Sequence, residues 1–195
     1  LAKHHNIEKD SENAILIEAT KTNAKDLIEL LIKSGADLEA RDYNASTPLI
    51  IASENNRKDL VELFLDNGPN IEAKDVDGFT ALLKSSKVNA KETAKLLIDR
   101  GANIEAINNE EENALMIAAR SNFLEFASLL LDNEANIESE NFEIWSPLLN
   151  ATAKNNKEMA QLLIDGGASI ETGDYGWPPI ILAAQKGSKE VLERL

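Results

Sequence analysis

The sequence predicts an all-α fold, an α-solenoid of stacked helix-turn-helix repeats with a 33-residue period and projecting β-turn or hairpin loops. Three recurring patterns predict it. The first is a triplet that returns at steps of 33 residues, and of 32 at the last step, at Ala14-Ile15-Leu16, Thr47-Pro48-Leu49, Thr80-Ala81-Leu82, Asn113-Ala114-Leu115, Ser146-Pro147-Leu148 and Pro178-Pro179-Ile180. Self-similarity at a fixed period of this length is the signature of a repeat architecture.

The second and third patterns are residues that end helices. An Asn or Gly follows each triplet, at Asn23, Asn56, Asn89, Asn122, Asn155 and Gly187. Each of five Leu/Ile/Phe-rich runs is then closed at Gly35, Gly68, Gly101, Glu134 or Gly167. Gly and Asn favour the left-handed conformation that terminates helices, so each repeat should contain two short helices.

The physics of one repeat can be followed from its residues. Thr47-Pro48-Leu49 suits a first helix, because Pro in the first turn loses no intrahelical hydrogen bond. The second helix should begin near Lys58-Asp59, where the acid complements the helix dipole. The stretch from Asn70 to Phe79 should form the projecting turn, with its tip at Asp77-Gly78.

Two short helices cannot bury their apolar faces alone, so neighbouring repeats should stack into a single solenoid over residues 1–195. We expect complete repeats at 9–41, 42–74, 75–107, 108–140 and 141–172, the end of a truncated repeat at 1–8 and a truncated repeat at 173–195. Neither end carries a polar capping repeat, and we therefore expect the chain to be an excerpt of a longer array.

These columns resemble the ankyrin repeat along the whole chain. Segment 42–74 is the closest match, with Thr47-Pro48-Leu49, Ala52 and Gly68, and Gly35-Ala36-Asp37 also fits the family motif. The family usually has His after Thr-Pro-Leu, whereas this chain has Ile17, Ile50, Leu83, Met116, Leu149 and Ile181. Apolar packing should replace the polar network of that His. Glu134 replaces a Gly, which costs roughly 1 kcal/mol in the left-handed conformation.

The composition of the chain argues against binding to nucleic acid and to membranes. The chain has 195 residues, 43% hydrophobic and 28% charged, and a net charge of −14, which is typical of a folded protein that repels nucleic acid and anionic lipid. The acidic surface also disfavours self-association and predicts a monomer. The sequence has no cysteine, no apolar run long enough to span a membrane and no N-terminal pattern of a secretory leader. We therefore expect an intracellular, cytoplasmic protein.

Catalytic and metal-binding patterns are missing from the sequence. The only histidines, His4 and His5, are adjacent, which makes a poor metal pair and an implausible catalytic triad. There is no phosphate-binding Gly-rich motif. The sequence therefore predicts no enzyme activity, no cofactor and no metal.

A column of acids shares one position of every repeat: Glu8, Glu39, Glu72, Glu105, Glu138 and Glu171. One interpretation is a solvated acidic ladder that discourages self-association. The other is contact with a basic partner.

Aromatic residues concentrate on the projecting turns, at Tyr43, Phe79, Phe142, Trp145, Tyr175 and Trp177. Aromatic side chains are frequent binding anchors, because they bury a large area with few rotatable bonds. Alternatively, Phe79, Trp145 and Trp177, which share one column, pack between adjacent turns.

Basic residues gather at the exposed ends of the first helices, where Lys87, Arg120, Lys154 and Lys186 lie. Such a strip would suit an acidic peptide. Alternatively, these cations only complement the helix dipoles.

The predicted function is that of a protein–protein interaction module. The resemblance implies a concave face, formed by turn tips and first helices, that binds a protein or peptide, here one with an acidic stretch. The alternative is a structural spacer, or a regulatory segment of a larger multidomain protein whose enzyme or channel lies elsewhere in the chain.

Overall fold

The computed structural model describes residues 2–171 and 178–195, and of residues 2–10 it describes the backbone alone. These residues form helices joined by turns, without a strand. The helices are α1 (Ala2–Thr22), α2 (Lys25–Lys33), α3 (Pro48–Glu54), α4 (Lys58–Leu65), α5 (Ala81–Lys87), α6 (Lys91–Asp99), α7 (Ala114–Ser121), α8 (Leu124–Asp132), α9 (Pro147–Ala153), α10 (Lys157–Asp165), α11 (Pro179–Lys186) and α12 (Lys189–Leu192). The all-α prediction is confirmed.

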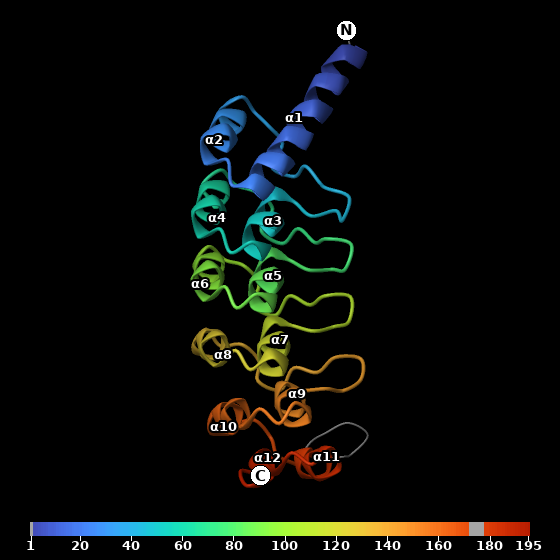
Figure 1. The fold of residues 1–195 in the computed structure, drawn as a ribbon, viewed down its shortest axis with the longest axis vertical. Helices are drawn as coiled ribbons and strands as arrows, with labels where there is room; N and C mark the ends of the chain where they lie inside the picture. The colour runs from blue at the N-terminus through green and yellow to red at the C-terminus, as the bar shows by residue number, and fades with distance from the viewer. Residues whose placement is uncertain (1, 172–177) are drawn as a thin grey trace. The chain divides into compact units, whose positions relative to one another are not determined.

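The chain divides into two compact units, Leu1–Asn103 and Ile104–Leu195. In the first unit, α3 packs against α1 and α5, while α4 packs against α6 (Figure 1). The second unit repeats the scheme, with α9 between α7 and α11, and α10 between α8 and α12. Each unit is therefore a two-layer stack of helical hairpins, in which first helices form one layer and second helices the other.

Side-chain caps start the first helices where the triplets predict. The side-chain oxygen of the residue before the helix accepts a hydrogen bond from the backbone N–H three residues later. The pairs are Thr47 with Ile50 (3.4 Å), Thr80 with Leu83 (3.3 Å), Asn113 with Met116 (3.0 Å) and Ser146 with Leu149 (3.3 Å).

The predicted helix stops are also confirmed. Left-handed backbone occurs at Asn23, Asn56, Asn89, Asn122, Asn155 and Gly187, and again at Gly35, Gly68, Gly101, Glu134 and Gly167. Glu134 adopts this conformation with φ = 64°, so the fourth repeat keeps the turn without its glycine.

The first helix differs from the prediction. The triplet Ala14-Ile15-Leu16 predicted that a first helix begins near residue 14, but α1 runs without a break from Ala2 to Thr22, so that boundary is wrong. Ala14 occupies the capping position of the other repeats and has no side-chain oxygen to start a helix there. Because residues 2–13 also contain no Gly or Pro, nothing local interrupts the helix.

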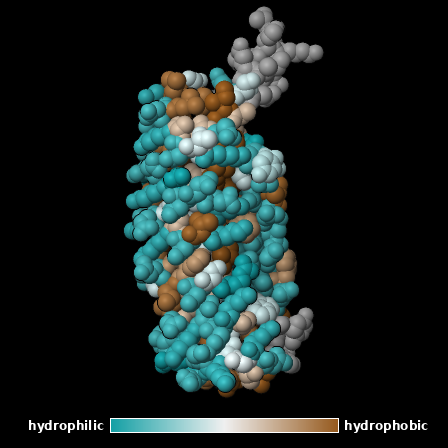
Figure 2. Space-filling model, in the orientation of Figure 1, coloured by the Kyte–Doolittle hydropathy of each residue, from teal (hydrophilic) through white to brown (hydrophobic). Residues whose placement is uncertain are grey.

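Apolar columns form the core of both units. Ile17, Ile50, Leu83, Met116 and Leu149 are buried at the position where the resemblance expected His, as predicted, while Ile181 is exposed. The first hairpin, α1 and α2, leaves apolar side chains exposed at its end of the first unit (Figure 2). They include Ile15, Leu27 and Leu30. Leu60, one period after Leu27, is fully buried, because the preceding hairpin covers it in the stack.

The acidic column joins successive repeats, a role that neither interpretation of it anticipated. Four of the six glutamates each accept a hydrogen bond from a backbone N–H 31 residues later. The pairs are Glu39 with Asn70 (2.7 Å) and Glu72 with Asn103 (2.7 Å) in the first unit, and Glu105 with Asn136 (2.7 Å) and Glu138 with Ser169 (2.6 Å) in the second. The carboxylates therefore satisfy backbone donors that the turns leave unpaired.

Glu105→Ala should lower the free energy of unfolding by about 2 kcal/mol, because hydrogen bonds to a charged acceptor are stronger than neutral ones. Besides Asn136, the Glu105 carboxylate accepts hydrogen bonds from Asn113 (3.1 Å) and Ser139 (3.2 Å). Urea denaturation followed by circular dichroism measures the change. The control is Glu140→Ala, which removes an exposed carboxylate and should leave stability within about 0.5 kcal/mol. Equal losses in both variants would contradict the proposed link between repeats.

Candidate binding surface

An aspartate or asparagine closes each of four projecting turns that the structure describes. Its side-chain oxygen accepts hydrogen bonds from the backbone N–H groups two and four residues later, an arrangement that stabilises tight turns. These residues are Asp42, Asp75, Asn108 and Asn141. The turn then presents the next side chain to solvent, so Tyr43 is 87% and Phe142 72% exposed.

Lysines flank the aromatic side chains of the first unit. The Nζ atom of Lys21 lies 5.3 Å from the centre of the Tyr43 ring and 3.3 Å from Asp42. Phe79 is half-buried, with the Nζ atoms of Lys84 and Lys87 at 5.0 Å and 5.2 Å from its ring centre. These cation–π contacts hold the lysines over the rings. Tyr43 remains largely exposed, whereas Phe79 is partly covered.

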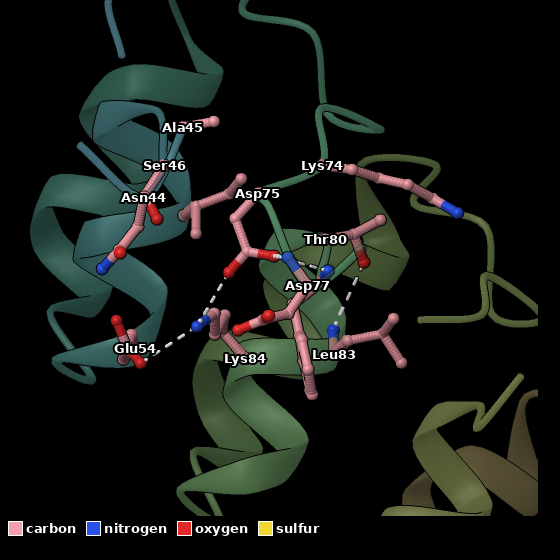
Figure 3. Close-up of polar contacts among 12 residues, drawn as sticks. Asn44, Ala45, Ser46, Glu54, Lys74, Asp75, Asp77, Thr80, Leu83 and Lys84 are labelled. Atoms are coloured by element: carbon pink, nitrogen blue, oxygen red, sulfur yellow. Dashed lines mark hydrogen bonds and ion pairs between the residues drawn. The ribbon is translucent and has the colours of Figure 1, made fainter. Parts of the chain in front are cut away.

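An ion-pair cluster of Lys84, Asp75 and Glu54 joins α5, the turn before it and α3 (Figure 3). The Nζ atom of Lys84 is 2.9 Å from Asp75 and 3.1 Å from Glu54, and the Asp75 side chain is only 1% exposed. Burial by itself would lower the pKa of Lys84, but hydrogen bonds to Asp75 and Glu54 outweigh it and raise that pKa above its ordinary value. Lys84 therefore stays charged at neutral pH and ties α5 to α3.

Lys84 is not among the binding residues that the sequence predicts. The repeat pattern nevertheless indicates that Lys84 is unusual, because the residues one period before and after it, Ile51 and Ile117, are buried apolar residues. A lysine at a core position requires a partner.

Arg120 forms an ion pair with Glu112 in the second unit. Its guanidinium contacts both carboxylate oxygens of Glu112, at 2.5 Å and 3.3 Å. Glu112 is buried and also accepts a hydrogen bond from Asn108 at 3.2 Å. Because the Glu112 carboxylate already compensates the positive charge of Arg120, the Arg120 charge contributes little to the attraction of an acidic partner.

The second unit contains a groove of about 690 Å³. It is lined by Asn109, Glu110, Glu112, Arg120, Asn141, Phe142, Glu143, Trp145, Asn150, Ala153, Lys154 and Lys186. Five side chains predicted as binding residues therefore meet here, from the turns and from the ends of three first helices. The structure places Tyr43, Phe79 and Lys87 in the first unit, and Tyr175 and Trp177 fall outside the residues that it describes.

The turn beside the groove carries an unusual backbone. Ile144 has φ = 60°, a left-handed conformation that Ala45, Gly78 and Glu111 share in the other turns. A β-branched side chain is unfavourable there, because its Cβ crowds the carbonyl oxygen. Ile144 is also 36% exposed, so burial gives little compensation for the strain.

Ile144→Gly should raise the free energy of unfolding by about 1 kcal/mol, since glycine adopts the left-handed conformation without steric cost. Thermal and urea denaturation measure the change. The neighbouring Glu143→Gly supplies the control, because the left-handed residues do not include Glu143 and glycine gains nothing there. A destabilised Ile144→Gly protein would show that Ile144 makes contacts worth more than the strain.

Two further sequence expectations concern membranes and metals. Among the described residues, every helix is too short or too polar to cross a lipid bilayer. Over the same part of the chain, His, Asp and Glu side chains do not gather into groups suited to a metal ion.

A comparison with protein families matches residues 1–75, 68–141 and 135–195 to the model described as ankyrin repeats (3 copies). A comparison with curated proteins finds no match. Ankyrin repeats generally act as protein–protein interaction modules. Since the family matches span the sequence, and the helical hairpins stack as the repeat pattern requires, the chain belongs to the ankyrin-repeat family.

Proposed function

We propose that this chain is a monomeric interaction module that binds a protein or peptide partner on the surface formed by its turn tips and first helices. The groove of the second unit supports the proposal most directly. It combines a 72% exposed Phe142, a half-buried Trp145 and the basic ends of first helices in one concavity. Exposed aromatic side chains beside a groove are the usual anchors of protein recognition.

The test selects ligands from a displayed library of random peptides against the full chain. The dissociation constants of the enriched peptides are then measured by fluorescence anisotropy. Phe142→Ser and Trp145→Ala should each weaken binding by about tenfold or more, because removing an aromatic anchor from an interface typically costs that much. Circular dichroism shows whether each variant remains folded.

Tyr43→Ser is the matched control, since it removes an even more exposed turn aromatic from the first unit, which contributes no residue to the groove. Its binding should stay within about twofold of the parent. A spacer would behave differently: its peptides would bind all variants alike, or none would be enriched. Either outcome rejects the groove as the interaction site.

A further inference from the structure

We infer that the groove of the second unit selects a peptide segment in which an apolar side chain lies next to one or two carboxylate side chains. The inference rests on the proposed function and adds the chemistry of the partner. The contacts within the groove carry it, because its residues include an apolar wall, a compensated ion pair, two exposed acids and two cations that form no ion pair with a described residue.

The apolar wall comes from the turn that Asn141 closes. Phe142 is exposed and Trp145 is half-buried, and both side chains line the groove, so this turn presents apolar surface to it. Two backbone N–H groups bonded to the Asn141 side chain hold this turn in place. A preorganised apolar wall favours an apolar side chain in the partner, because burying both surfaces removes them from water.

The cations lie on the helix side of the groove. Lys154 follows the last residue of α9, and Lys186 is the last residue of α11. Among the described residues neither forms an ion pair, whereas Lys21, Lys84 and Arg120 each pair with a carboxylate of a turn. Two positive charges that no described carboxylate compensates, beside an apolar wall, favour a ligand with carboxylates close to its apolar group.

The acids of the groove limit how acidic the ligand can be. Glu110 and Glu143 are exposed on the turns, opposite in charge to the lysines. A long polyacidic peptide or a nucleic acid would bring negative charge against these glutamates and against a chain of net charge −14. The groove therefore suits one short acidic cluster directed towards Lys154 and Lys186.

The peptides enriched in the library selection test this chemistry. They should contain an apolar or aromatic residue within a few positions of Asp or Glu. Lys154→Gln combined with Lys186→Gln should weaken their binding by about tenfold, and added sodium chloride should reduce the difference between variant and parent.

Lys33→Gln combined with Lys58→Gln makes the same change of net charge on exposed second-helix positions of the first unit. These substitutions should change binding by less than about twofold, since screened charges far from the ligand act weakly. Circular dichroism confirms that both double variants fold.

The outcomes separate the two proposals. Enriched peptides that lose affinity with Phe142→Ser but carry no acid, or that are indifferent to the lysine substitutions, would keep the interaction module and overturn the apolar-acidic specificity. Peptides that bind all variants equally, or a selection without enrichment, would overturn both.

Discussion

Asp75→Ala is expected to lower the free energy of unfolding by about 3–5 kcal/mol, because it leaves the buried Lys84 without its closest carboxylate. The same substitution removes the acceptor of the Asp77 and Phe79 backbone N–H groups. The turn and the contact from α5 to α3 should therefore weaken together.

Urea denaturation followed by circular dichroism measures this loss, and hydrogen exchange should show faster exchange around α3 and α5. Asp77→Ala is the control in the same turn: Asp77 is exposed, and its removal should change stability by less than about 0.5 kcal/mol. Similar effects of the two substitutions would mean that the buried ion pair contributes little to folding.

Phe126→Ala is expected to cost about 3–5 kcal/mol, because the Phe126 side chain is fully buried within α8 and its removal leaves a cavity. In a stack of repeats, each hairpin depends on its immediate neighbours. The destabilisation should therefore spread from α8 to α7 and α10, the helices against which it packs.

The control removes the same atoms from the surface. Phe142→Ala deletes an aromatic ring that is 72% exposed and should leave the urea midpoint nearly unchanged. Hydrogen exchange of the Phe126→Ala protein should show its largest increases in α7, α8 and α10. If the two Phe→Ala variants lost equal stability, burial would not be the origin of the effect.

Features that depend on a few consecutive residues could be predicted from the sequence. The cap at Thr47 and the left-handed stops at Asn56 and Gly68 need only their own side chains and backbone, and the structure confirms them. The same local chemistry explains the error in α1. A 33-residue alignment assigned a boundary at Ala14, although alanine cannot cap a helix there.

The candidate groove was only partly predictable. The sequence identified Phe142, Trp145 and Lys154 as separate binding candidates, and all three lie in the expected repeat 141–172. The sequence does not show which cations pair with a carboxylate inside the fold. The ion pair between Arg120 and Glu112, for example, follows from where the fold places the two side chains.

Local propensity and a fixed period encode the repeat, the helix boundaries after α1 and the membership of the ankyrin family, so these features could be predicted without a structure. Tertiary structure decided the rest: that Glu105 bonds a backbone N–H of the next repeat, that Lys84 is neutralised by Asp75, and that Lys154 is not neutralised by any described carboxylate. Those pairings are set by the distances between side chains once the hairpins stack, and spacing along the chain does not specify them.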